Sequence, residues 1–141
     1  MQCRNRLHAN AHRWFAFLAL AAYLAAGCRD DGLKLGEVSG RVTLDGDPVS
    51  GAFITFHPQF PGRPSMAKTD EDGYYELRFN PSRWGALVGE HHVTVSTEDR
   101  TADDRLIPEV IPEKYRGENF IAVTVESGSQ VHDFELTTGD E

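Results

Sequence analysis

Apolar and polar residues alternate in short runs from Glu37 onward, and clusters of Gly, Pro, Asp and Ser separate these runs. Successive side chains of a strand point to opposite faces of a sheet, so this alternation is typical of strands that bury one face. No stretch beyond Glu37 keeps the period of an amphipathic helix. The pattern therefore predicts an all-β domain.

Seven runs carry the alternation, with turn signals between them. They cover residues 38–44, 52–56, 66–69, 74–79, 91–96, 121–125 and 132–136. The strongest turn signal is the stretch from Asp70 to Gly73, in which a glycine follows three acidic residues. This spacing predicts a seven-stranded Greek-key β-sandwich over residues 37–138 and a short tail at 139–141. The inward positions supply enough large apolar side chains for a core without disulfides or metal.

The first 27 residues differ in kind from the rest of the chain. Arg4, Arg6 and Arg13 precede thirteen uncharged residues, 14–26, and the run ends in small residues. This is the layout of a secretory signal peptide, which we expect to form an N-terminal signal helix over residues 1–27. A membrane-spanning helix would need about 20 apolar residues, so the run is too short for a permanent span.

The end of this segment, Leu24-Ala25-Ala26-Gly27-Cys28, resembles the lipobox of bacterial lipoproteins. The resemblance implies that Cys28 receives a diacylglyceryl group on its sulfur and becomes the first residue after cleavage. A thiolate is the nucleophile that this thioether bond requires. The match departs from the family pattern at Ala25, because the leucine usual at that position is displaced to Leu24.

Cysteine usage supports the anchor. Cys3 lies in the segment expected to be removed, so Cys28 is the only cysteine of the mature chain and no intrachain disulfide can form. We expect residues 28–36 to be a tether, and the part from Arg29 to Gly36 spans at most about 29 Å. The sequence thus predicts an extracytoplasmic, membrane-anchored lipoprotein, and it is compatible with either the inner or the outer membrane.

The charge is distributed very unequally. The first 27 residues carry three arginines and no acid, whereas the other 114 residues carry 11 Lys and Arg against 22 Asp and Glu, a net charge of −11. Such a body repels the phosphates of nucleic acids, and no basic stripe interrupts the acidity. We therefore expect no nucleic-acid partner. The expected partners are the membrane, through the lipid, and an envelope protein or glycan.

Two longer stretches resemble a known family: Val-Ser-Gly-Arg-Val-Thr-Leu-Asp-Gly-Asp-Pro-Val-Ser-Gly-Ala at 38–52 and Thr-Asp-Glu-Asp-Gly-Tyr-Tyr-Glu-Leu at 69–77. Together with residues 85–95, 111–115 and 133–136, they resemble the carboxypeptidase-regulatory-like, transthyretin-like (prealbumin-like) domain. They are similar in particular to small lipoproteins that are abundant in planctomycete-type bacteria. The resemblance implies a sandwich that serves as a non-catalytic binding or structural unit, without cofactor.

The residues that resemble a hydrolase site do not fit one. Tyr115-Arg116-Gly117 is similar to the C-terminal motif of transthyretin-related hydroxyisourate hydrolases, but here it lies inside the chain. His91 and His92 are adjacent in one strand and should face opposite ways, so they cannot flank one substrate. We expect no catalytic residues, with a hydroxyisourate hydrolase as the least favoured alternative.

The acidic turn Asp70, Glu71 and Asp72 offers hard oxygen ligands for calcium. Its spacing fails the EF-hand pattern, because the position that corresponds to the first ligand is Lys68. We expect a solvated hairpin turn in which Asp side chains bind nearby backbone N–H groups, and no metal site beyond weak calcium binding.

The candidate binding surface consists of loop side chains: Phe60, Arg63, Arg83 and Trp84. Exposed aromatic residues on loops can act as stacking platforms for a glycan or a protein. The alternative is that Phe60 and Trp84 cover the open ends of the core.

The long connection 97–118 also leaves two possibilities, because it either packs as a flap through Leu106, Ile107, Ile111 and Tyr115 or forms a partner surface.

Overall fold

The computed structural model describes residues 32–139. The expected signal peptide, Cys28 and most of the expected tether lie outside this range. Contacts divide the chain after Gly32, and the fold described below belongs to the unit that begins at Leu33. In the part of the chain that the structure describes, no helix has both the length and the apolar character needed to cross a membrane.

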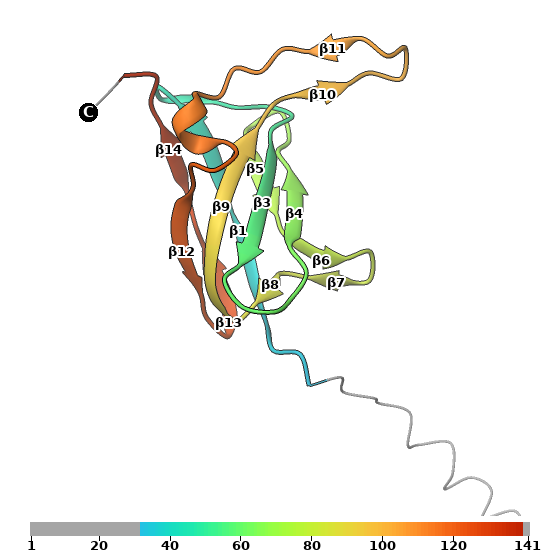
Figure 1. The fold of residues 1–141 in the computed structure, drawn as a ribbon, viewed down its shortest axis with the longest axis vertical. Helices are drawn as coiled ribbons and strands as arrows, with labels where there is room; N and C mark the ends of the chain where they lie inside the picture. The colour runs from blue at the N-terminus through green and yellow to red at the C-terminus, as the bar shows by residue number, and fades with distance from the viewer. Residues whose placement is uncertain (1–31, 140–141) are drawn as a thin grey trace, which may run out of the picture. The chain divides into compact units, whose positions relative to one another are not determined.

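Strands dominate the described residues (Figure 1). The longer ones are β1 (Leu35–Leu44), β3 (Phe53–Pro58), β4 (Ser65–Lys68), β9 (Gly89–Ser96), β12 (Ile121–Val125) and β13 (Gly128–Val131). Those of two or three residues are β2 (Asp47–Pro48), β5 (Tyr74–Glu76), β6 (Arg78–Asn80), β7 (Arg83–Trp84), β8 (Ala86–Leu87), β10 (Asp99–Arg100), β11 (Leu106–Ile107) and β14 (Phe134–Leu136). A single 3-10 turn, η2 (Glu113–Tyr115), interrupts the β structure within residues 32–139.

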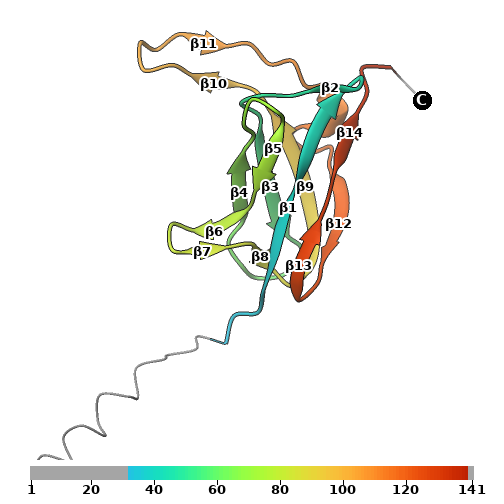
Figure 2. The same cartoon turned by 180° about the vertical axis from the view of Figure 1, so that it is seen from behind.

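Two large sheets organise these strands (Figure 2). In the first, β1 is central: β8, β5 and β2 pair antiparallel along one edge, and β13 and β14 pair parallel along the other. The second sheet has the order β12-β9-β3-β4-β6-β7 and is antiparallel throughout. Strands β10 and β11 form a separate two-stranded hairpin.

All seven predicted runs lie in strands, which confirms the all-β prediction, but the strand count of seven is not what the structure has. The run at 74–79 divides at Leu77, because β5 pairs with β1 in the first sheet whereas β6 pairs with β4 in the second. The last run, 132–136, contains only β14, and β13, which precedes it and pairs with the same strand β1, was not among the predicted runs. β1 also begins at Leu35, two residues before the expected domain boundary, which shortens the expected tether.

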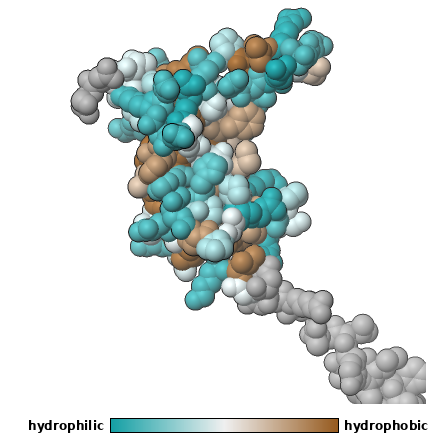
Figure 3. All heavy atoms as spheres, viewed as in Figure 1, coloured by the Kyte–Doolittle hydropathy of each residue, from teal (hydrophilic) through white to brown (hydrophobic). Residues whose placement is uncertain are grey.

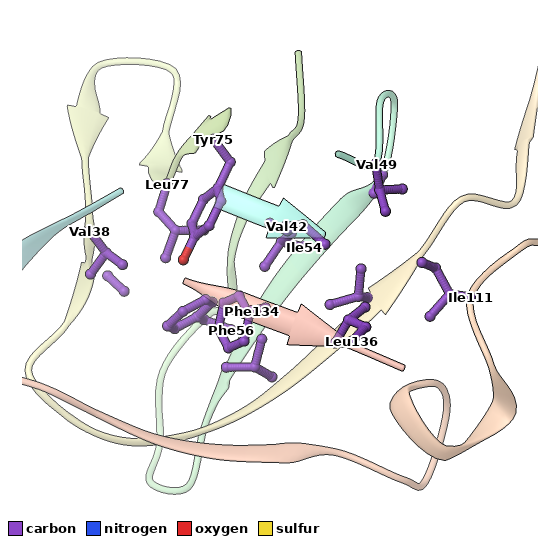
Figure 4. Packing of buried hydrophobic residues seen from close by; sticks show 14 of the residues in the cluster. Val38, Val42, Val49, Ile54, Phe56, Tyr75, Leu77, Ile111, Phe134 and Leu136 are labelled. Atoms are coloured by element: carbon purple, nitrogen blue, oxygen red, sulfur yellow. The ribbon is translucent and has the colours of Figure 1, made fainter. Parts of the chain in front are cut away.

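The core lies between the two sheets, and both contribute to it (Figure 4). Phe56 of the second sheet meets Phe134 of the first edge-on, with ring centroids 6.2 Å apart, and Tyr75 stacks on Phe134 at 6.1 Å. The other large buried members are Val38, Val42, Ile54, Leu77, Val93, Val95, Ile111, Val125 and Leu136. Full burial of each such side chain contributes roughly 1.5–3 kcal/mol to folding.

One close backbone approach explains a glycine of the first predicted strand. The break between β13 and β14 places the carbonyl oxygen of His132 against β1, where a Cβ on Gly40 would lie 1.9 Å from it. The same carbonyl accepts a hydrogen bond from the Tyr75 hydroxyl at 2.7 Å, and the His132 N–H donates to the Ser39 carbonyl at 2.9 Å. Only glycine fits where two backbones meet in this way.

The connection between β9 and β12, residues 97–120, packs only in part as the expected flap. Ile111 is buried in the core and Tyr115 packs against it, as a flap would. Leu106 instead lies on the protruding hairpin β10–β11 with 62% of its surface exposed. Figure 3 shows apolar surface on this hairpin among largely hydrophilic atoms.

A single carboxylate, that of Glu109, ties this connection to the end of β9. It accepts hydrogen bonds from the Ser96 hydroxyl and from the backbone N–H groups of Thr97 (3.0 Å) and Ile111 (2.8 Å). The guanidinium of Arg116 lies 4.0 Å away. Burial alone would raise the pKa of Glu109, but these hydrogen bonds outweigh it and lower the pKa to about 2.

Candidate functional site

Two of the four predicted surface residues, Phe60 and Arg63, cover the end of the core. The Phe60 ring packs edge-on against the ring of His91, with centroids 5.9 Å apart, and lies so close to Gly89 that a Cβ there would be 2.5 Å from it. The Arg63 guanidinium lies over the Phe79 ring at 5.5 Å. These contacts favour the end-covering interpretation for this loop.

The other two predicted residues, Arg83 and Trp84, form β7, and Arg83 is half-buried. The indole of Trp84 remains 46% exposed. The guanidinium of Arg78, on the paired strand β6, lies 3.6 Å from the centre of this indole, which is cation–π distance. Phe60 is also 36% exposed, but its ring packs against the buried His91, whereas the indole of Trp84 lies against the exposed Arg78.

Trp84 borders a groove of about 390 Å³ on the outer face of the first sheet. Its polar lining comes from three neighbouring strands: Glu37 and Ser39 of β1, Glu76 of β5, and Ser129 and Gln130 of β13. We call this depression the Trp84 groove. A second depression, of about 300 Å³, borders Trp84 on the side where Arg78 lies, together with Tyr74 and Met66.

Strand register brings the groove residues together. Ser39 pairs with Glu76 on one side of β1, and Glu37 pairs with Ser129 on the other. Because Val38 points into the core, its neighbours Glu37 and Ser39 point outward. The sequence shows Glu37, Ser39 and Glu76 as outward positions of predicted strands, but it predicts no strand at β13, and only the pairing of β1 with both β5 and β13 places these residues around one groove. Sequence analysis therefore missed all of them except Trp84.

The two carboxylates of the groove are hydrogen-bonded without a counter-ion. The Ser129 hydroxyl donates to Glu37 at 2.6 Å, and the Tyr74 hydroxyl donates to Glu76 at 3.1 Å. Of the ion pairs found within residues 32–139, none involves Glu37 or Glu76. An ionised carboxylate accepts hydrogen bonds only, so the groove presents negative charge and acceptors to a ligand.

The histidines take the opposite orientations that were expected for neighbours in a strand. His91 is 1% exposed, lies between the rings of Phe56 and Phe60, and has its Nδ1 3.0 Å from the Gly89 carbonyl. Burial lowers the pKa of His91, against the contrary effect of that carbonyl. His92 points to the other face, where it stacks on the Phe120 ring. His91 and His92 therefore lie on opposite faces of the sheet, and only His91 is buried.

The acidic turn has the hydrogen-bonded form that was expected. The carboxylate of Asp70 accepts from the N–H groups of Asp72 (3.0 Å) and Tyr74 (2.8 Å), and Gly73 takes a positive φ of 74°. Among the residues that the structure describes, no three His, Cys, Asp or Glu side chains are grouped so that they could hold a metal ion.

Comparisons with known proteins find little similarity. No family model and no curated protein matches the sequence. Among solved structures, a DUF3823 family protein from Parabacteroides merdae is similar, with a TM-score of 0.47 and 14% identity over 74% of this chain. The match spans 47% of that protein's chain, a little under half of its length.

Proposed function

We propose that this chain is a non-catalytic, lipid-anchored module of the cell envelope that binds a ligand in the Trp84 groove. The observation that carries the proposal is the exposed indole of Trp84 beside two carboxylates that have no counter-ion among the described residues. Large exposed aromatic side chains with convergent polar groups are typical of binding sites.

We further propose that its two sheets form the Greek-key β-sandwich of the carboxypeptidase-regulatory-like, transthyretin-like kind. Support comes from the single core that both sheets share and from the family-like stretches at 38–52 and 69–77. The parallel pairing of β13 and β14 with β1 is a feature that the strand pattern alone does not predict.

The anchor is the second half of the proposal. The lipobox resemblance assigns the lipid to Cys28, and only seven residue steps separate Cys28 from the start of β1 at Leu35. That length of extended chain spans at most about 25 Å. The Trp84 groove includes Glu37, close to the start of β1, so a lipidated chain would hold the groove near its membrane.

Metabolic labelling tests the anchor. We expect radiolabelled palmitate to enter the wild-type chain and not the Cys28→Ser variant, which should also remain uncleaved. The variant Cys3→Ser is the matched control and should be labelled and processed as the wild type is. Normal labelling and cleavage of Cys28→Ser would overturn the lipoprotein assignment.

Co-sedimentation with purified cell-wall glycan tests the binding role. The wild type should sediment with the glycan, and Trp84→Ala should stay in solution while its thermal unfolding is unchanged, because Trp84 lies outside the core. The control Phe120→Ala removes an aromatic side chain of nearly equal exposure, 45%, and should sediment normally. Equal sedimentation of Trp84→Ala and wild type would remove the groove from the proposal.

The absence of catalysis is tested with hydroxyisourate, the substrate of the least favoured alternative. We expect hydrolysis at the uncatalysed rate, since His91 is enclosed by the core and offers no exposed base. Enzymatic turnover that disappears in His91→Ala would show that the protein is a hydrolase after all.

A further inference from the structure

The chemistry of the Trp84 groove restricts which ligand it takes. Resting on the binding role proposed above, we infer that the groove holds a glycan segment that carries free amino groups, that is, hexosamine units without their acetyl groups. The inference depends on the spacing of the two carboxylates, on the surroundings of Trp84, on the position of the groove within the sheet, and on the charge of the chain.

The carboxylates are arranged to receive two donors at once. Glu76 lies directly across from Ser39, and Glu37 is two residues before Ser39 on the same face of β1. Glu37 and Glu76 are therefore diagonal neighbours, a relation that separates residues by about 7–8 Å. Each carboxylate accepts only one hydrogen bond from within the described residues, which leaves acceptor capacity for ammonium or hydroxyl groups of a ligand.

The indole of Trp84 suits a ligand of this kind. The Arg78 guanidinium already lies against it at cation–π distance, on the side of the second depression. Arg78 does not line the Trp84 groove, whose lining the indole shares with Glu37, Glu76 and Ser129. On that side the ring offers an apolar platform for a sugar ring and a further attraction for a positive charge.

The position of the groove disfavours an extended peptide. The groove lies across β13, β1 and β5, and the backbone of β1 is paired on both sides at Ser39, with Val131 and with Glu76. Peptides that add a strand need free backbone groups at a sheet edge. Over β1, in the middle of the groove, only side chains are available, and the hydroxyl, amide and carboxylate groups of the lining match the hydroxyl and amino groups of a sugar.

Charge favours a cationic glycan over the other glycans. The chain from Cys28 onward has a net charge of −11, so acidic polysaccharides are repelled. A neutral glycan can donate its hydroxyl groups to the two carboxylates, but it leaves their negative charge uncompensated. A cationic glycan gains from both carboxylates.

The sequence supplies a clean spectroscopic reporter for the test. The chain has two tryptophans, Trp14 and Trp84, so the Trp14→Phe background leaves Trp84 as the only indole. The full-length chain in detergent is titrated with three probes: a glucosamine tetramer, an N-acetylglucosamine tetramer and tetralysine. Fluorescence of Trp84 reports on the groove directly, and calorimetry measures the variants that lack this residue.

We expect the glucosamine tetramer to change the Trp84 emission and to bind at least about tenfold more tightly than the acetylated tetramer. Trp84→Ala should weaken its binding about tenfold or more, and Glu37→Gln and Glu76→Gln should each weaken it up to about fivefold. Glu118→Gln and Phe120→Ala are the matched controls, because neither residue lines the Trp84 groove. Both variants should bind the tetramer as the wild type does. Added salt should weaken binding, because the carboxylates face solvent.

The outcomes separate the inference from the proposed function. If the acetylated tetramer binds as tightly and still requires Trp84, the amino-group inference is wrong while the binding role stands. If tetralysine binds more tightly than either sugar, the ligand is a basic peptide and the inference is again wrong. If no probe binds and the sedimentation with glycan is also insensitive to Trp84→Ala, the inference and the proposed binding role both fail.

Discussion

The core between the sheets and the connection from residue 97 to 120 are held in different ways. In the core, large apolar side chains interlock, and backbones approach so closely at Gly40 that no side chain fits. In the connection, Ile111 enters the core, the hairpin β10–β11 protrudes with Leu106 exposed, and the carboxylate of Glu109 joins the two ends.

This difference indicates that the two regions can lose their structure separately. Apolar burial is distributed over many residues, so the core should unfold as one cooperative unit. The hydrogen bonds around Glu109 concentrate on one side chain, and an isolated two-stranded hairpin is marginally stable in water. The connection should therefore open locally while the sheets remain intact.

The largest expected effect comes from Gly40→Ala. The added Cβ would collide with the His132 carbonyl at 1.9 Å, and neither backbone can move without breaking the pairing of β1 with its neighbours. We expect the cooperative thermal transition, followed by circular dichroism, to disappear. Gly139→Ala is the control, because a Cβ there meets nothing within 4 Å. A normal transition for Gly40→Ala would show that the β13–β14 break is placed differently.

Phe56→Ala should be nearly as severe but leave a folded protein. It empties the centre of the core, where Phe56 meets both Phe134 and His91, and such truncations cost about 3–5 kcal/mol of unfolding free energy. Urea denaturation measures the loss. Phe120→Ala, at an exposed site, should change the unfolding free energy by less than about 1 kcal/mol. Equal losses in both variants would contradict the assignment of the core.

The same contrast explains which parts of the structure the sequence predicts. Alternation identifies Val38, Val42, Ile54, Phe56, Val93 and Val95 as inward because burial depends on local periodicity. It does not reveal that the run 74–79 changes sheets at Leu77, since both halves alternate equally well.

The alternation also does not reveal the Trp84 groove, whose residues converge through strand register. Glu109 carries no sequence signal either, because its partners Ser96 and Thr97 lie 13 and 12 residues away.

Glu109→Gln should act on the connection and leave the core intact. Glutamine keeps the size of the side chain but loses the charge that strengthens three hydrogen bonds, which we expect to cost about 1–3 kcal/mol. Hydrogen exchange at residues 97–111 and tryptic cleavage after Arg100 and Arg105 should accelerate. The exchange of the amides of β3 and β9 should stay at the wild-type rate, and faster exchange there would show that core and connection unfold together.

Acid offers the gentlest way to separate the two regions, because His91 in the core and Glu109 in the connection titrate in different pH ranges. The pKa of His91 is lowered by burial, so the folded core favours the neutral ring and loses stability as the pH falls below about 6.5. The pKa of Glu109 is lowered to about 2, so its contribution is complete above its ordinary value near 4.5 and disappears between there and about 2. Two changes are thus expected on acidification: first a decrease in the urea midpoint of the core, then faster exchange in the connection. In His91→Gln the first decrease should shrink, and in Glu109→Gln the second change should already be present at neutral pH. If connection and core responded together at every pH in both variants, the two regions would form a single cooperative unit.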